Sequence, residues 1–146
     1  MDKIDKALTY YENRITQLKN IYSHNIKFNV TTNIEDIIND YTYLNEDEKL
    51  ENVIVNFTGK IIRKRCLSAQ LFFYDLLSNN YNIQILADAI YYDDINEYIK
   101  MMELLHRGDT IGVIGFPYRS KENVLSIVPK KIILLEPYSI MQHGFS

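Results

Sequence analysis

The sequence predicts a mainly β fold with helices, and three observations carry this prediction. Five segments alternate apolar and polar residues with the period of a strand, polar turns separate them, and one segment of helical periodicity falls between the third and the fourth. At 146 residues the chain suits one domain with its own hydrophobic core. Five short strands with a helix after the third are the plan of a five-stranded Greek-key barrel, the OB-fold.

The first strand is predicted over 52–65, where Val55 and Phe57 alternate with polar residues and Gly59 indicates a bend or bulge. Pro129 lies in the last strand, where a proline is tolerated at an edge or a bulge. The remaining strands are predicted at 70–76, 81–87, 110–116 and 124–135, and the helix between the third and fourth strands at 93–106.

Two helices are predicted ahead of the first strand. Apolar residues recur at steps of four and three along 2–20, which predicts an amphipathic helix with a single apolar stripe. Thr32 and Glu35 fit a capping box that opens a second, short helix ending near Tyr41. The stripe of the first helix consists of Ile4, Leu8, Tyr11, Ile15, Leu18 and Tyr22.

The composition argues against several kinds of site. The single cysteine, Cys66, excludes a disulfide framework and a multi-cysteine zinc site, and the three histidines are widely separated. The few glycines do not cluster ahead of a helix as in a phosphate-binding loop, and no residues have the pattern of a catalytic centre. No apolar run approaches the ~20 residues of a membrane span. We therefore expect a cytoplasmic chain with no membrane partner, no metal and no cofactor of its own.

Positive charge is concentrated in two places although the net charge is −3. Residues 59–73 hold four basic and no acidic residues, and residues 117–146 hold four basic and two acidic residues. If the fold brings these segments together, they form one positive face that could meet phosphates; alternatively, they are solvated strand residues. The candidate phosphate contacts are Arg63, Lys64, Arg119 and Lys121.

The predicted second and third strands hold residue types that bind single-stranded nucleic acid. Phe72 and Phe73 are adjacent, so one should face the core and the other the solvent. An exposed aromatic ring can stack on a base, and Gln84 can both donate to and accept from a base edge. Arg65, at the end of the first strand, can reach a base carbonyl and a phosphate. Each of these residues could equally be an ordinary core or surface residue of a barrel.

Several stretches together resemble the N-terminal anticodon-binding domain of class II lysyl-tRNA synthetases, especially the eukaryotic cytosolic type. The likeness spans residues 10–141, which is nearly the whole chain. The family's Gly-Glu pair at the tip of the last hairpin is replaced here by Asn123 and Val124. The stretches that carry the likeness are Tyr11–Ile15, Leu71–Leu76, Ile83–Asp88, Arg107–Pro117 and Leu125–Pro129.

The resemblance implies recognition of the uridine-rich lysine anticodon. Phe72 occupies the position of the family's aromatic residue that stacks on the central uridine, and Arg65 and Gln84 match the residues that contact the same base. The implied partner is the tRNA for lysine. The implied domains are a helical extension at 1–50, the anticodon-binding barrel at 51–137 and, at 138–146, the start of a linker to a catalytic domain that this chain lacks.

The parent protein implied by the resemblance is an ATP-dependent lysine–tRNA ligase used in translation, with ATP and Mg²⁺ bound by the absent catalytic domain. This chain alone should then be inactive as an enzyme. Two other functions remain open. The N-terminal helix could serve protein interaction, as in a homodimer of the parent or a contact with a synthetase scaffold protein, and the barrel could bind single-stranded nucleic acid without regard to sequence.

Overall fold

The computed structural model describes residues 3–6, 9–10, 12–14 and 27–138, and confirms the predicted order of strands and helices. Helix α3 falls between the third and fourth strands, as expected. The elements are α2 (Ile34–Tyr41), β1 (Val55–Ser68), β2 (Leu71–Ser78), β3 (Tyr81–Asp88), α3 (Ile95–Leu104), β4 (Thr110–Arg119) and β5 (Leu125–Glu136).

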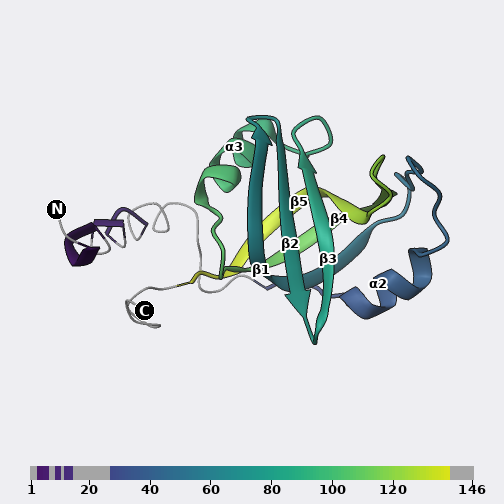
Figure 1. Cartoon of the computed structure of the whole chain (residues 1–146), viewed down its shortest axis with the longest axis horizontal. Coiled ribbons are helices and arrows are strands. Elements are labelled where there is room, and N and C mark those ends of the chain that lie inside the picture. The colour runs from purple at the N-terminus through teal and green to yellow at the C-terminus, as the bar shows by residue number, and fades with distance from the viewer. Residues whose placement is uncertain (1–2, 7–8, 11, 15–26, 139–146) are drawn as a thin grey trace.

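The five strands close into a barrel in the order β1-β2-β3-β5-β4, with β1 and β4 paired to complete the circle. All neighbouring pairs are antiparallel except β3 and β5, which are parallel. In Figure 1, β1, β2 and β3 form the wall nearest the viewer, and β4 and β5 cross behind them. This mixed five-stranded barrel, with its helix after β3, has the architecture of an OB-fold.

The core fills the barrel from strand residues that alternate inward, and the two helices cover different parts of it (Figure 1). The Tyr98 hydroxyl of α3 donates to the carbonyl of Ala87 over 3.3 Å, which fixes this helix against β3. Ile34 and Ile37 of α2 are fully buried, and Ile34 lies next to Gly59.

Several strands and helices begin or end at other residues than the sequence predicts. β1 continues to Ser68 and β4 to Arg119, because each keeps its partner through the segments predicted as turn or loop. The N-cap of α2 is Asn33, whose side chain accepts from the backbone N–H of Asp36 over 2.8 Å. The predicted capping box at Thr32 and Glu35 is therefore wrong by one residue, since an asparagine caps a helix as well as a threonine does.

The predicted N-terminal helix lies mostly outside the described residues. Residues 3–6, 9–10 and 12–14 are helical. Of the apolar stripe, only Ile4 is described, and it is exposed.

Gly115 marks a bulge between β4 and β5. The register shifts between Ile114, which pairs with Lys131, and Gly115, which pairs with Pro129. Of the two alternatives predicted for Pro129, an edge or a bulge, the structure shows the bulge. A Cβ atom at Gly115 would lie 2.3 Å from the carbonyl oxygen of Val128, so the backbones approach too closely for any side chain.

We expect Gly115→Ala to destabilise the barrel by roughly 1–3 kcal/mol or more, because the new methyl group collides with backbone that cannot move aside cheaply. Gly59→Ala is the matched control, since its Cβ would meet the Leu76 side chain at 3.1 Å, a contact that a small shift relieves. Urea unfolding of both variants measures the difference. Equal destabilisation of the two would contradict this account of Gly115.

Candidate nucleic-acid interface

The outer face of β1, β2 and β3 is defined by the strand registers. Arg65 pairs with Phe73, and Phe73 pairs with Leu86. In the next row, Arg63 pairs with Asp75, and Asp75 pairs with Gln84, which in turn pairs with Ser126 of β5. Side chains on paired residues project to the same side of a sheet. The outer face therefore presents two parallel rows, with arginines at one edge, an aromatic ring in the middle and an amide beyond it.

Phe72 and Phe73 face opposite sides, as predicted. Phe72 packs against the core, its ring centroid 6.5 Å from both Tyr74 and Tyr98. Phe73 does not belong to the buried core and shares its face with Asp75. The stacking role assigned to Phe72 stays a prediction, but the geometry favours Phe73 for it. The signal lay in the sequence, because Asp75 marks the solvent side of β2 and Phe73 has the same parity.

The Arg65 guanidinium lies over the Phe73 ring, with the guanidinium carbon 4.9 Å from the ring centroid. An exposed cation–π contact contributes ~0.5–1 kcal/mol, whereas stacking of a base on an aromatic ring contributes ~1–3 kcal/mol. The contact between the guanidinium and the ring is therefore weaker than stacking of a base on the same ring would be.

The four candidate phosphate contacts fall into two groups. Lys64 donates through Nζ to the carbonyls of Met102 and Leu105 over 2.6 and 2.7 Å. Burial lowers the pKa of Lys64 below its usual value. Arg119 donates to the carbonyls of Leu44 and Thr42 over 3.0 and 2.7 Å. These two cations hold the fold together and are poorly placed for a phosphate.

Arg63 and Lys121 form the second group. Both are exposed, and neither makes a hydrogen bond or ion pair within the described part of the chain. Lys60, which is not among the predicted phosphate contacts, is exposed on β1 and pairs with Leu77. The β1 edge of the outer face thus carries Lys60, Arg63 and Arg65, a row of positive charge beside the aromatic ring.

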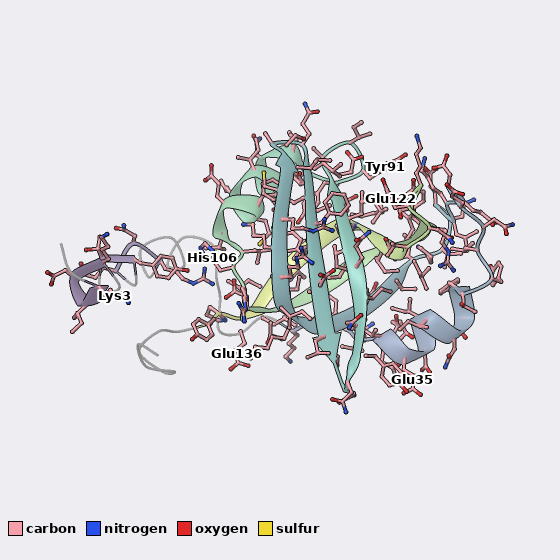
Figure 2. The ribbon with its side chains drawn as sticks, viewed as in Figure 1. Lys3, Glu35, Tyr91, His106, Glu122 and Glu136 are labelled. Atoms are coloured by element: carbon pink, nitrogen blue, oxygen red, sulfur yellow. The ribbon has the colours of Figure 1, made fainter. Side chains whose placement is uncertain are left out.

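The hairpin between β4 and β5 is closed by Ser120, whose N–H donates to the carbonyl of Val124 over 2.9 Å. Asn123 adopts a left-handed backbone with φ of 64°, a conformation that asparagine tolerates better than most residues. Asparagine therefore makes the turn possible at this position without a glycine. Val124 is 40% exposed, and Glu122 projects from the tip of the hairpin (Figure 2).

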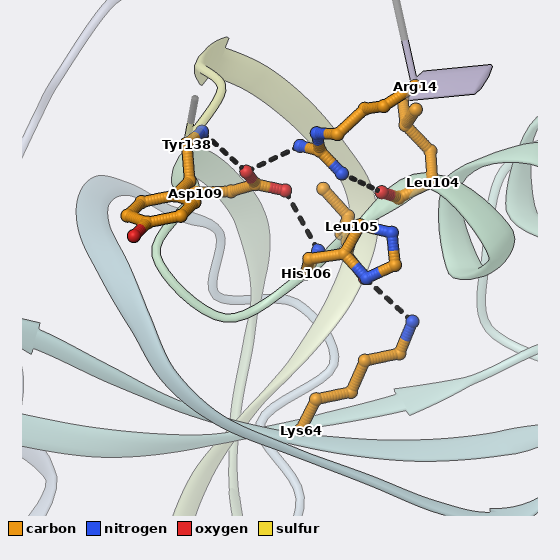
Figure 3. A network of polar contacts seen from close by, with 7 residues as sticks. All are labelled: Arg14, Lys64, Leu104, Leu105, His106, Asp109 and Tyr138. Atoms are coloured by element: carbon orange, nitrogen blue, oxygen red, sulfur yellow. Dashed lines mark hydrogen bonds and ion pairs between the residues drawn. The ribbon is translucent and has the colours of Figure 1, made fainter. Parts of the chain in front are cut away.

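A second polar cluster lies beside α3, and its contacts are structural (Figure 3). The buried Asp109 carboxylate accepts from Arg14 Nη2 at 2.5 Å and from the backbone N–H of Tyr138 at 2.8 Å on one oxygen. Its other oxygen accepts from the backbone N–H of His106 at 2.8 Å. Arg14 also donates to the carbonyl of Leu104. Both carboxylate oxygens are engaged, so Asp109 is not placed to act as a general base.

His106 lies beside the same cluster, and its surroundings lower its pKa below the usual value. Burial lowers its pKa, and the positive charges of Arg14 and Lys64 lower the pKa further. In the described residues no group of three or more histidine, cysteine, aspartate or glutamate side chains could hold a metal ion. Among those residues there is likewise no helix long and apolar enough to cross a membrane.

The barrel and its outer face define an OB-fold domain with a basic, aromatic surface. Comparison with known proteins shows which OB-fold proteins the chain is similar to. No family model matches the chain. The chain is 30% identical over 130 residues to lysine–tRNA ligase cla4 of Cladosporium cladosporioides, which covers 86% of the chain and 22% of that protein. It is 33% identical over 141 residues to a lysine–tRNA ligase of Buchnera aphidicola subsp. Cinara cedri, covering 90% of the chain and 26% of that protein.

A third relative is the protein named "probable lysine–tRNA ligase, cytoplasmic" of Enterocytozoon bieneusi, 29% identical over 144 residues, with 93% of the chain and 27% of that protein covered. The chain is therefore homologous to the N-terminal region of lysine–tRNA ligases. It spans about a quarter of the length of these relatives. Relatives as different as those of Cladosporium and Buchnera match it similarly, so the likeness does not single out the eukaryotic cytosolic type.

We expect Asp109→Asn to lower the free energy of unfolding by roughly 3–5 kcal/mol, because it leaves the Arg14 charge buried without a counter-ion. Asp93→Asn is the control, since Asp93 is an exposed acid in a turn and surface substitutions usually change stability by less than ~0.5 kcal/mol. Urea unfolding at neutral pH measures both. A loss at Asp109 no larger than at Asp93 would show that the ion pair is not needed for the fold.

Proposed function

We propose that this chain is the anticodon-binding domain of a lysine–tRNA ligase, and that the outer face of β1, β2 and β3 reads the uridine-rich lysine anticodon. Two lines of support meet here. The relatives that match 86–93% of the chain are named lysine–tRNA ligases. The strand registers bring Arg65, Phe73 and Gln84 to one face, and this juxtaposition is the observation that carries the proposal.

Each residue has a distinct role in the proposed recognition. The Phe73 ring stacks on the central uridine in place of the Arg65 guanidinium. Arg65 then donates to a carbonyl of the base, and Gln84 hydrogen-bonds to its edge. Lys60 and Arg63 on β1, together with Lys121 on the hairpin, meet the phosphates along the strand. Three cations of this kind make a modest, salt-sensitive electrostatic contribution to the free energy of RNA binding and do not give a general affinity for nucleic acid.

The ligase reaction itself belongs to the parent protein in this proposal. The relatives are about four times as long as the matched region, so ATP and Mg²⁺ would be bound by parts of the protein outside this chain. The role of this chain is to hold the anticodon while the acceptor end of the same tRNA reacts elsewhere. We place the parent in the cytoplasm, of the eukaryotic cytosolic type. Its contacts with a second subunit or a synthetase scaffold protein would use the N-terminal helix.

We expect Phe73→Leu to weaken binding of an RNA hairpin carrying the lysine anticodon by roughly 1 kcal/mol or more, the lower end of what base–aromatic stacking contributes. Phe72→Leu is the matched control, because it makes the same chemical change one residue away, on the core side. Fluorescence anisotropy at one fixed salt concentration measures both affinities, and urea unfolding checks that both variants are folded. Weakening by Phe72→Leu alone would return the stacking role to Phe72.

A hairpin that differs only at the central uridine separates base reading from general strand binding. Tighter binding of the uridine hairpin supports the proposed function. Equal binding of the two hairpins would contradict it and favour a sequence-indifferent single-strand binder. Binding of neither would direct attention to a protein partner.

A further inference from the structure

A short chain of hydrogen bonds links the base-reading amide to the hairpin between β4 and β5. Gln84 Nε2 lies 2.9 Å from the hydroxyl oxygen of Ser126, and that hydroxyl lies 3.0 Å from the carbonyl oxygen of Val124. Ser126 is completely buried, although its neighbours Gln84 and Val124 reach the surface. A buried hydroxyl between an amide and a carbonyl keeps the same two hydrogen-bond partners, because no water can replace them.

The direction of these hydrogen bonds follows from the number of protons available. A carbonyl oxygen can only accept, so the single hydroxyl proton of Ser126 points to Val124. The same hydroxyl must then accept from Gln84, and only the amide nitrogen can donate. The opposite amide orientation would place an oxygen of Gln84 against a hydroxyl whose proton is already engaged, with two lone pairs facing each other. Ser126 therefore fixes which end of the Gln84 amide points to β5.

The other end of the amide, Oε1, is not the end that bonds to Ser126. β2 flanks β3 on the side opposite β5, and there Asp75 pairs with Gln84 and Phe73 with Leu86. Within the described part of the chain, Gln84 Oε1 makes no hydrogen bond. A base stacked on Phe73 thus meets an acceptor at this point. Uracil has an N–H at its N3 position and satisfies that acceptor, whereas cytosine has a lone pair at N3 and is repelled by it.

A glutamine that is free to rotate cannot make this distinction. If its amide turns over, Nε2 replaces Oε1 and donates to the N3 of cytosine. We propose that Ser126 is a positioning residue that locks the Gln84 amide in the orientation that selects uracil over cytosine. This inference rests on the proposed function, because it requires a base to stack on Phe73. Ser126 itself is buried and touches no RNA.

The test measures the ratio of affinities for two RNA hairpins that carry uridine or cytidine at the central anticodon position. Ser126→Ala removes only the hydroxyl, and the Val124 carbonyl keeps its hydrogen bond from the Ser120 N–H. We expect the unmodified chain to prefer uridine on the order of tenfold or more, and Ser126→Ala to reduce this preference to about threefold or less. The loss should come mainly from tighter binding of the cytidine hairpin.

Two controls separate positioning from a general structural effect. Ser120→Ala removes a buried hydroxyl from the same hairpin, one that accepts from the Val124 N–H over 3.1 Å and does not contact Gln84, so the preference should persist. In a Gln84→Ala background, Ser126→Ala should change the preference no further, because Ser126 acts only through that amide. A further change in this background would overturn the inference.

The outcomes distinguish failure of this inference from failure of the proposed function. If the unmodified chain does not distinguish the hairpins, base reading itself is contradicted. If it prefers uridine and Ser126→Ala keeps the full preference, the anticodon-binding proposal stands and the role of Ser126 is overturned. If Ser120→Ala loses the preference to the same extent, the effect belongs to the hairpin as a whole and the inference is likewise overturned.

Discussion

The outer face depends on a one-residue bulge in β1. Up to Ile61, the odd-numbered residues of this strand point into the core, as the buried Phe57 and Ile61 show. The register shifts between Ile61 and Arg63, and beyond this point Arg63 and Arg65 pair with outward-facing residues of β2. Without the extra residue, both arginines would point into the barrel, where burying an unpaired charge costs several kcal/mol. The bulge therefore lets a single strand contribute to the core at one end and to the basic surface at the other.

The same bulge turns Lys64 inward, where it becomes part of the fold. Its ammonium group bonds to the carbonyls of Met102 and Leu105 at the C-terminal end of α3. A cation is favourable at this end of a helix, because the terminal carbonyls are unsatisfied and partly negative. The loop that follows contains Asp109, which joins Arg14 and Tyr138 to the barrel. The structural cluster and the proposed RNA-binding face thus use opposite faces of the same strand, and stability and binding can be changed separately.

Most of the architecture could be predicted from the sequence, because strand periodicity, polar turns and the helix after β3 are local signals. The ends of β1 and β4 could not, since they depend on pairing partners far along the chain. The hydrogen bonds of Lys64 and Arg119 could not be predicted from the sequence for the same reason, because both side chains donate to carbonyls of distant segments. Gly59 indicated a bend near the right place, but the register shift occurs three residues later, at Ile62.

The residue types of the candidate site could be predicted from the sequence, but the side of the sheet on which each residue lies could be predicted only in part. Arg65 and Gln84 share a face, but the resemblance points to Phe72 as the stacking ring and does not indicate which side of the strand that ring faces. Asp75 supplied that check, because a carboxylate next to a buried tyrosine fixes which side of β2 meets water. Ser126 lies in a stretch that carries the resemblance, but the sequence does not indicate a role for its hydroxyl. From the sequence, a serine in an apolar strand is expected to be an ordinary core residue. The structure shows that its hydroxyl bonds to both Gln84 of β3 and Val124 of the hairpin.

The most direct test of this account is an NMR titration of the isotope-labelled chain with an RNA hairpin carrying the lysine anticodon. The account predicts that the largest shift changes fall on the outer face of the barrel, at Arg65, Phe73, Asp75 and Gln84, and on the hairpin at Lys121. Residues of α3 and the cluster around Asp109 should change little. Shift changes confined to α3 or to the helical residues near the N-terminus would contradict the account and place the binding surface elsewhere on the molecule.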